Sequence, residues 1–375
     1  MILPPLTYIT VDSVLEGAGH TQVLPYLAGL AELGLRIELH SFETAQIAET
    51  TLEQIASLGI NWSPHRFGRS GPRGGVERLL RGAALSRRAE LVHARGTLPA
   101  ASAYLGRAHS WLWDMRGFWT DARIAVGTVR PGSLVERTLR RLEEHVAKSA
   151  DAIVVLSDRA RNELGQRYGP AVASKARTIP TCTDLSRFSF VELPPYPPYR
   201  LLFSGSLSPR YDLPTMISFA KALGAHGKVE LTALVPQTSP RLAELRASDA
   251  FVLHPSQTEI PGQVARSHAG LCVLAPSPAD VASMPTKVGE FLATGRPVIV
   301  SPEIGDLDRL LSDYACGVVI GSPEHDAVRA GARQFAEMLT DQELPSRCRA
   351  LATKYFDVAT AVQKLFDIYT EIVPR

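Results

Sequence analysis

Cysteine is scarce in this chain, and long apolar runs do not occur. Its 375 residues include four cysteines, which are Cys182, Cys272, Cys316 and Cys348. They form no CxxC pair, so we expect no zinc site and interpret them as buried free thiols in a reducing compartment. No apolar stretch approaches the roughly 18 residues of a spanning helix, and the first residues lack the charged and apolar regions of a signal peptide. We therefore expect a cytoplasmic protein, soluble or peripheral to the inner face of a membrane.

A large excess of charge of one sign is also missing. With 45% hydrophobic and 21% charged residues the composition is globular, and the length indicates two domains of roughly 150 residues or more. Residues 1–190 nevertheless hold 23 Lys and Arg against 18 Asp and Glu, whereas the remainder holds 17 against 20. The densest basic run, Arg66 to Arg88, has two interpretations: a surface that contacts anionic lipid, or a solvated arginine-rich face. Aromatic residues do not alternate with these arginines, so we predict no nucleic-acid partner.

Short apolar runs alternate with helical patterns in both halves of the chain. The main helices are expected at 20–33, 45–58, 134–147 and 286–294. Strands are expected at 6–10, 36–42, 90–94, 111–115 and 152–157, and then at 200–204, 229–234, 250–253, 271–274, 297–300 and 317–320. This alternation predicts parallel sheets with crossover helices. Four prolines between Glu192 and Tyr199 predict a linker.

We therefore predict an α/β fold with two doubly wound, Rossmann-like domains, residues 1–190 and 191–355, which face each other across a cleft. Apolar residues recur with helical spacing in the final segment, 356–375, and we expect this helix to pack on the N-terminal domain. In such sheets ligands bind at the carboxyl ends of the strands. The loops that follow the strands are therefore where chemistry is expected.

One predicted helix begins with residues suited to a phosphate. Ser283 is a candidate N-cap, and Pro285 suits a helix start. The free amides around Thr286 and the positive end of the helix dipole favour an anion, to which Lys287 adds a full charge. Glu290 shares the face of Lys287 at i+3, and a carboxylate there suits ribose hydroxyls. The alternative is an ordinary surface helix with a Lys–Glu pair.

Two loops that follow predicted strands are further candidates for phosphate binding. Glycines let backbone amides approach a phosphate closely. The first loop departs from the dinucleotide fingerprint because Gln22 takes the place of the third glycine, so an ordinary turn is equally compatible. The residues of interest in the two loops are Gly17, Gly19, Gly205, Ser206 and Arg210.

Two predicted strands end in polar clusters. His93 and Arg95 end one strand and lie on the same face because side chains alternate. Asp114 and Arg116 end another, followed by Trp119. Carboxylate and guanidinium groups bind hydroxyls and an indole packs on a sugar ring, so these residues predict a sugar site. A core tryptophan beside a surface ion pair is the alternative.

The sequence Asp306-Leu307-Asp308 matches the DxD pattern of metal-dependent glycosyltransferases, but it stands at a predicted helix start where Asp acts as a cap. We therefore predict neither a bound metal nor a cofactor.

In their order along the chain, these motifs resemble retaining glycosyltransferases of the GT-B fold, family 4 type, and within them a bacterial polysaccharide subgroup. The matching segments are 17–26, 93–96, 114–119, 179–188, 205–213 and 285–306.

The resemblance implies a nucleoside-diphosphate sugar as donor and a glycan, lipid-linked or small-molecule hydroxyl as acceptor. It implies that Glu290 binds the ribose and that Lys287 holds the diphosphate. The implied donor-binding residues are Gly17, Gly19, Gly205, Ser206, Arg210, Pro285, Thr286, Lys287 and Glu290. The implied acceptor residues are His20, Asp114, Arg116 and Trp119, and the implied catalytic residues are Lys287, Glu290, His93 and Arg95.

The chain departs from the family pattern at three positions. Ala282 stands where a carboxylate is common, Ser206 where Arg is usual, and Arg95 where many relatives have His. Lys287 is therefore the leading candidate for the main cationic partner of the diphosphate, with Arg210 as a substitute for the missing arginine.

We expect sugar transfer with retention of the anomeric configuration, by a same-face reaction because no second carboxylate stands out for a double displacement. Three other classes remain open: a sugar-nucleotide epimerase of the same fold, a two-lobed sugar-binding protein, and a dinucleotide-dependent dehydrogenase. The binding protein would normally be exported. The incomplete glycine fingerprint argues against the dehydrogenase, although Glu43 does supply an acidic residue after the second strand.

Overall fold

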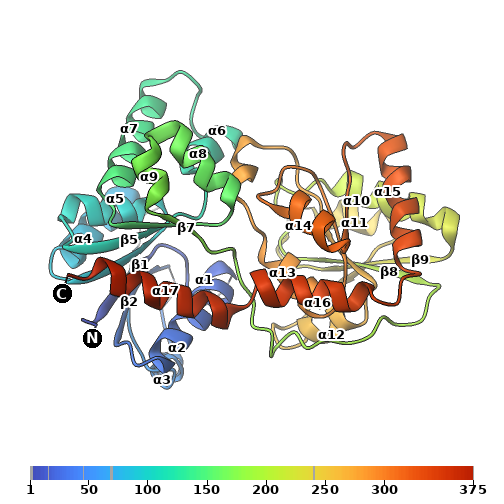
Figure 1. The fold of residues 1–375 in the computed structure, drawn as a ribbon, viewed down its shortest axis with the longest axis horizontal. Helices are drawn as coiled ribbons and strands as arrows, with labels where there is room; N and C mark the ends of the chain where they lie inside the picture. The colour runs from blue at the N-terminus through green and yellow to red at the C-terminus, as the bar shows by residue number, and fades with distance from the viewer. Residues whose placement is uncertain (1–2, 16, 45, 68–70, 240, 375) are drawn as a thin grey trace. The chain divides into compact units, whose positions relative to one another are not determined.

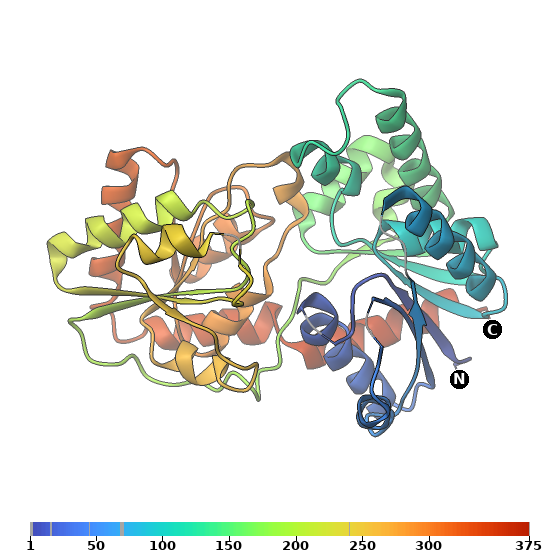
Figure 2. The ribbon, with the colours of Figure 1, turned by 180° about the vertical axis from the view of Figure 1, so that it is seen from behind.

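The computed structural model describes residues 3–15, 17–44, 46–67, 71–239 and 241–374, and the chain divides into two units (Figure 1, Figure 2). The first unit comprises the chain up to Pro180, residues 281–283 and the segment from Val358 onward. The second unit comprises residues 181–280 and 284–357. Each unit is built on its own parallel sheet.

The sheet of the first unit is doubly wound. Its strands lie in the order β3-β2-β1-β4-β5-β6-β7, and all neighbouring pairs are parallel. The order reverses between β1 and β4, which is where ligands bind in such sheets. The strands are β1 (Leu6–Thr10), β2 (Ile37–Glu43), β3 (Ile60–Arg66), β4 (Leu91–Arg95), β5 (Ser110–Asp114), β6 (Ala152–Val155) and β7 (Ala176–Thr178).

Helices cover both faces of this sheet. They are α1 (Gly17–Gln22), α2 (Leu24–Glu32), α3 (Glu49–Ala56), α4 (Gly71–Ser86), α5 (Thr97–Gly106), α6 (Trp119–Ala125), α7 (Leu134–Ser149), α8 (Asp158–Tyr168), α9 (Pro170–Ser174) and α17 (Val358–Ile372). Ile9, Ala94 and Trp113 belong to the apolar core on the side of α5 and α7. On the other side, α17 packs against α2 so closely that a Cβ atom on Gly29 would lie 2.8 Å from Val362.

Strand register gathers polar side chains at one edge of the first sheet. Thr10 of β1 is opposite Arg95 of β4, and Arg95 is opposite Asp114 of β5. All three residues lie at the carboxyl ends of their strands. Because alternate residues share a face, His93 lies on the same face as Arg95.

The sheet of the second unit repeats this winding. Its order is β10-β9-β8-β11-β12-β13, again parallel throughout, and it reverses between β8 and β11. The strands are β8 (Tyr199–Ser204), β9 (Val229–Leu234), β10 (Phe251–Leu253), β11 (Ala269–Cys272), β12 (Val298–Val300) and β13 (Gly317–Val319). The helices are α10 (Leu213–Leu223), α11 (Leu242–Arg246), α12 (Ile260–Ala265), α13 (Thr286–Ala293), α14 (Leu307–Tyr314), α15 (His325–Met338) and α16 (Leu344–Tyr355), with short 3-10 turns at Gly224–His226 and Pro278–Ala282.

These sheets confirm the prediction of two Rossmann-like α/β domains, and α17 packs on the first unit as expected. The prediction of one continuous helix over residues 20–33 is wrong. This segment is divided into α1 and α2 at Val23, because Pro25 lacks the N–H that a continuing helix would need. The helix expected at 45–58 is the shorter α3, and residue 45 lies outside the described residues. The edge strands β3 and β7 were not predicted; Pro64 interrupts the apolar alternation of β3.

The boundary between the units differs from the predicted one. Residues 181–190 belong to the second unit, where the amide of Thr183 donates to the carbonyl of Phe356. The proline-rich segment that we interpreted as a linker also belongs to the second unit. The buried guanidinium of Arg296 holds its start by donating to the carbonyls of Val191 and Glu192.

All four cysteines are buried free thiols, as predicted. Among the described residues, no helix is both long enough and apolar enough to cross a membrane.

The packing of α13 on β11 predicts a strong steric effect at Gly270. A Cβ atom on Gly270 would lie 2.1 Å from the ring of Phe291, so that α13 would have to shift. We expect Gly270→Ala to lower the free energy of unfolding by about 1–3 kcal/mol, the usual cost of overpacking. Gly262→Ala is the matched control, because no atom lies within 4 Å of its Cβ position and alanine favours the helix. Denaturant unfolding of both variants measures the difference, and equal stabilities would contradict this account of the packing.

Candidate sugar and phosphate sites

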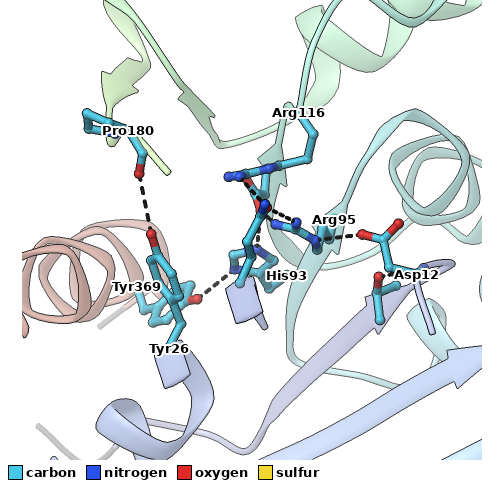
Figure 3. A network of polar contacts seen from close by, with 10 residues as sticks. Asp12, Tyr26, His93, Arg95, Arg116, Pro180 and Tyr369 are labelled. Carbon is cyan, nitrogen blue, oxygen red and sulfur yellow. Dashed lines mark hydrogen bonds and ion pairs between the residues drawn. The ribbon is translucent and has the colours of Figure 1, made fainter. Parts of the chain in front are cut away.

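The guanidinium of Arg95 organises the polar cluster of the first unit (Figure 3). Its Nη1 donates to Asp114 at 3.0 Å, its Nε to Asp12 at 3.0 Å and its Nη2 to the side-chain oxygen of Gln22 at 2.7 Å. Only 3% of the Arg95 side chain is exposed, whereas 40% of the Asp12 side chain is exposed. Arg95 therefore connects the loop after β1, helix α1 and the end of β5.

Arg116 completes the cluster from the loop after β5. Its Nη1 donates to Asp114 at 3.3 Å and its Nη2 to Gln22 at 2.9 Å. Asp114 thus accepts one guanidinium on each oxygen. Burial alone would raise the pKa of Asp114, but Arg116, His93 and Arg95 together hold it far below its usual range. Asp114 is therefore ionised at any physiological pH.

His93 joins this cluster to the C-terminal helix. Its Nδ1 lies 2.7 Å from the hydroxyl of Tyr369 on α17, and its ring stacks on Tyr8 with centroids 4.3 Å apart (Figure 3). Its Nε2 lies 3.5 Å from Asp114, which is too long for a good hydrogen bond. Burial lowers the pKa of His93, so the ring is neutral near pH 7.

The cluster is electrically balanced. Two guanidinium groups, Arg95 and Arg116, face two carboxylates, Asp12 and Asp114, while His93 is neutral. His93, Arg95, Asp114 and Arg116 border a small cavity of about 20 Å³, which is room for about one water-sized group. An electrically balanced set of donors and acceptors suits hydroxyl groups better than an anion.

The structure brings most of the predicted sugar-site residues together. His93, Arg95, Asp114 and Arg116 form one cluster, but His93 and Arg95 are 2% and 3% exposed. Such burial favours a role in positioning neighbouring groups over the direct catalytic role that we predicted for these two residues. Trp119 does not join them: it begins α6, and the guanidinium of Arg123 lies 4.7 Å from its ring centroid.

The glycine loop after β1 differs from the expected phosphate-binding turn. Gly17, Gly19 and His20 all lie within the short helix α1. A Cβ atom on Gly19 would lie 1.8 Å from the carbonyl oxygen of Ser13, so the close contact that requires glycine is made within the chain. The approach of Gly17 and Gly19 to a diphosphate stays a prediction.

Sequence reasoning missed three members of the first cluster. Gln22 was noticed only because it breaks a glycine fingerprint. Asp12 follows β1 directly, and its position at a strand end is the signal that could have found it. Tyr369 could not be paired with His93 from the sequence, since 276 positions separate the two residues.

In the second unit, Lys287 comes from the first turn of α13, and its ammonium lies beside the end of β8. Its Nζ lies 4.4 Å from the ring centroid of Phe203 and 4.1 Å from that of Tyr211. Gly205, at φ +132°, leaves room for the ammonium: a Cβ atom there would lie 2.9 Å from Nζ. The strand end, the glycine and the first turn of α13 therefore enclose one cation at the point where the strand order reverses.

The ammonium of Lys287 has no hydrogen-bond partner among the described residues, although only 7% of this residue is exposed. Two aromatic faces stabilise a cation by a modest amount, about 1–2 kcal/mol. Arg210, by contrast, forms an ion pair with the carboxylate of Asp280. Of the two predicted phosphate-binding cations, Lys287 is the one whose charge is left for a ligand.

Glu290 follows one turn after Lys287 on α13. Burial raises the pKa of its carboxyl group to about 6, and the charges of Lys287 and Arg187 offset only part of this shift. Ser206 of the loop after β8 is exposed, and Pro285 and Thr286 are half-buried. Lys287 therefore lies near both Gly205 and Glu290, and the binding of a donor by these residues stays a prediction.

Two predicted helix caps are corrected. The N-cap of α13 is Pro285 rather than Ser283, and no side chain caps this end. Asp306 occupies the N-cap position of α14 without a capping hydrogen bond, whereas Asp308 accepts the amide of Glu303 at 3.0 Å. Within the described part of the chain, no group of three or more His, Cys, Asp or Glu side chains is placed to hold a metal ion.

Two doubly wound sheets with polar strand-end loops define the GT-B glycosyltransferase fold, and solved structures of this fold align with nearly the whole chain. Sucrose-phosphate synthase from Thermosynechococcus elongatus gives a TM-score of 0.73 at 16% identity and 98% coverage of both chains. A glycosyltransferase from Rickettsia africae gives 0.73 at 14%, covering 100% of this chain and 99% of its own. HepE from Anabaena in complex with UDP-glucose gives 0.70 at 15%, with 98% and 100% coverage. At these identities the likeness shows the fold alone.

Residues 17–182 match the family model of the glycosyl transferase 4-like domain. A comparison with curated proteins gives no match. The family match over residues 17–182 and the shared fold together support a glycosyltransferase function.

The hydrogen bond between Tyr369 and His93 predicts a stability difference between two tyrosine variants. Tyr369→Phe leaves the buried Nδ1 of His93 without its partner, and we expect a loss of about 1–3 kcal/mol in the free energy of unfolding. Tyr104→Phe is the control, because the hydroxyl of Tyr104 makes no hydrogen bond with the described residues. Urea unfolding of the two variants gives the comparison. Equal losses would mean that the bond adds nothing to the attachment of α17.

Proposed function

We propose that this protein transfers a sugar from a nucleoside-diphosphate sugar to a hydroxyl group, with retention of the anomeric configuration, in polysaccharide or glycoconjugate biosynthesis. The observation that carries the proposal is the buried ammonium of Lys287, which lacks a hydrogen-bond partner in the described structure. An unpaired buried cation is costly to the fold. It gains its partner when an anion binds beside it, and a diphosphate is such an anion.

The donor diphosphate would lie between the loop after β8 and the first turn of α13. Lys287 would supply the charge, and the N-terminal turn of α13, which begins at Thr286, would supply further donors. Gly205 and Ser206 would allow the phosphates to approach the backbone. As the bond to the sugar breaks, negative charge builds up on the diphosphate, and fixed cationic groups stabilise that charge. HepE, which shares the fold, has been crystallised with UDP and with UDP-glucose, in line with this class of donor.

Arg210 would be a second and weaker contact of the diphosphate. Its pairing with Asp280 leaves it less charge to offer than Lys287. The role that a family arginine would take at Ser206 therefore falls mainly to Lys287.

Glu290 would accept hydrogen bonds from the ribose hydroxyls. Its position one turn from Lys287 sets it apart from the phosphate groups, and when it is ionised both oxygens of its carboxylate accept hydrogen bonds. Above its pKa of about 6 the group is ready for that role.

The cluster around Arg95 would bind the acceptor. Asp12 and Arg116 are its more exposed members, at 40% and 20%, and each already faces an opposite charge. Such a site gains little from an anionic acceptor but offers both donors and acceptors to hydroxyls. We therefore propose a neutral hydroxyl-bearing acceptor, with His93 and Arg95 holding Asp114 in place rather than reacting.

Retention would follow from a same-face displacement. A double displacement needs a carboxylate nucleophile near the sugar, and the position where the family commonly has one is Ala282, which is buried in the core of the first unit. The departing phosphate would then help to deprotonate the acceptor.

Replacement of Lys287 tests the proposal directly. Lys287→Met keeps the aliphatic volume but removes the cation, so we expect turnover to fall about 100- to 1000-fold. Because an unpartnered buried charge is removed, the free energy of unfolding should stay the same or rise. Lys221→Met, at an exposed position on α10, is the control and should leave both quantities unchanged. Wild-type turnover in Lys287→Met would rule out the proposed donor site.

The product of the wild-type reaction separates transfer from the alternatives. NMR should show a glycoside with the anomeric configuration of the donor. An inverted glycoside would contradict retention, and a nucleotide sugar with one inverted hydroxyl would identify an epimerase instead.

The raised pKa of Glu290 predicts how donor use depends on pH. We expect kcat/KM for the donor to fall as the pH drops through about 6, because protonation removes the negative charge and part of the acceptor capacity of this carboxyl group. The phosphates of a nucleotide sugar are diesters that titrate far below this range. Glu290→Gln should have a lower kcat/KM without this acidic limb, measured from initial rates over about pH 5 to 8. A limb that persists in Glu290→Gln would belong to another group.

The same carboxyl group affects stability in the opposite direction. Its pKa in the folded, unliganded protein is about 6 against an ordinary value of 4.5, so the folded state binds the proton more tightly. This contribution to stability is fully present below pH 4.5 and is lost as the pH rises through about 6.

A basic surface on α4 gives a second possible contact, with anionic lipid. Arg73 and Arg81 on α4 and Arg87 and Arg88 directly after it are exposed, and Arg69 lies outside the described residues. Arg78 is less available, since it donates to the carbonyl of Gly74 and lies over the ring of Phe67. We propose that this face approaches anionic membrane when the acceptor is lipid-linked.

A further inference from the structure

The segment between α6 and α7 exposes an unusual amount of apolar surface. Among the described residues, Leu134 and Val126 are the two most exposed large apolar side chains, at 77% and 72%, and Val135 is 58% exposed. Single exposed aliphatic residues are ordinary, but three within ten positions form a patch that calls for a partner. The loop between α6 and α7 extends beyond the neighbouring helices in both views (Figure 1, Figure 2).

This segment has a defined shape. The amides of Thr128 and Val129 both donate to the carbonyl of Arg123, at 2.9 and 3.2 Å, and the side chain of Val129 is buried. At the start of α7, Ser133 accepts the amide of Glu136 while Glu136 accepts the amide of Gly132. These bonds hold the loop in place, so its apolar side chains face solvent in a fixed arrangement.

The charge around the apolar patch is positive. Nearby carboxylates are already paired: Asp121 with Arg140 and Arg167, Glu136 with Arg140, and Glu144 with Lys148. The exposed Arg141 also acts on Glu144 and lowers its pKa, whereas the exposed Arg130 and Arg137 form no ion pair with the described residues. The segment therefore combines outward aliphatic side chains with unpaired guanidinium groups.

We propose that residues 126–141 form a membrane-binding element, in which Val126, Leu134 and Val135 enter the headgroup region of an anionic bilayer while the arginines bind lipid phosphates. Aliphatic insertion together with basic residues is the combination that gives stable, reversible attachment. A protein partner fits less well, because three side chains bury far less than the roughly 800 Å² per partner of a stable interface. A bilayer needs no matching pocket for each side chain.

This inference goes beyond the proposed function and does not depend on the donor site. It also differs from the α4 surface, which has its own exposed Val76 and Leu80. The two surfaces make separate predictions, because each can be altered without touching the other.

Vesicle flotation of the full-length protein tests the proposal. Wild type should float with vesicles that contain roughly one third phosphatidylglycerol, should not float with pure phosphatidylcholine, and should be released by high salt. The triple variant Val126→Ser, Leu134→Ser and Val135→Ser should lose binding by about tenfold or more, and Arg130→Glu with Arg137→Glu should lose it as well. Leu33→Ser with Leu105→Ser is the matched control, because these exposed aliphatic residues lie outside the segment, and should bind like wild type.

Two results would overturn the proposal: binding of the triple variant that equals wild type, or loss of all binding in Arg73→Glu with Arg81→Glu while the triple variant still floats. Transfer to a water-soluble acceptor should be unchanged in the triple variant. That measurement separates failure of the membrane element from failure of the proposed catalytic function, which would remove activity without affecting flotation.

Discussion

The winding of parallel strands is the constraint on which both sites of this protein depend. Where the strand order reverses, the two flanking crossovers run to opposite faces and leave the carboxyl ends of two neighbouring strands uncovered. In the first unit this place lies between β1 and β4, and in the second between β8 and β11. Arg95 and Gly205 each stand at or directly after one of these strand ends. The chemistry of each unit is therefore confined to loops whose positions are set by the sheet.

The two sites differ in whether a buried cation has hydrogen-bond partners. Arg95 is almost fully enclosed and is satisfied by Asp12, Asp114 and Gln22. Lys287 is nearly as buried, but its ammonium lies over two aromatic rings and has no hydrogen-bond partner among the described residues. A satisfied charge rigidifies its surroundings and is best suited to holding a site together. An unsatisfied one is a standing cost to folding that a bound anion can offset, so the same physical argument favours a structural role for Arg95 and underlies the proposed ligand-binding role of Lys287.

The sequence predicted the fold well because the strand and helix periods are local signals. It also predicted the Lys287–Glu290 helix start and the face shared by His93 and Arg95, for the same reason. It failed where distant segments decide the outcome. The pairing of Tyr369 with His93, the attachment of residues 181–190 to the second unit and the ion pair of Arg210 with Asp280 all join positions far apart in the chain. At Gly19 the close contact with Ser13 already requires a glycine, and the predicted approach of Gly19 to a diphosphate stays a prediction.

In the first unit, net charge differs between the interior, which is the cluster around Arg95, and the rim, which is the exposed segment from Val126 to Arg141. This difference bears on how an acceptor would reach the site. The inner cluster pairs two arginines with two carboxylates and has no net charge, whereas the outer segment from Val126 to Arg141 keeps unpaired arginines. An exposed positive rim attracts an anionic surface over about one Debye length, roughly 8–10 Å. Under the proposed function, a neutral interior would give no strong attraction to the phosphate of a lipid-linked acceptor. Attraction to the surface and recognition of the hydroxyl are thus separated, so an acceptor displayed on an anionic membrane would be bound by its sugar rather than trapped by its phosphate.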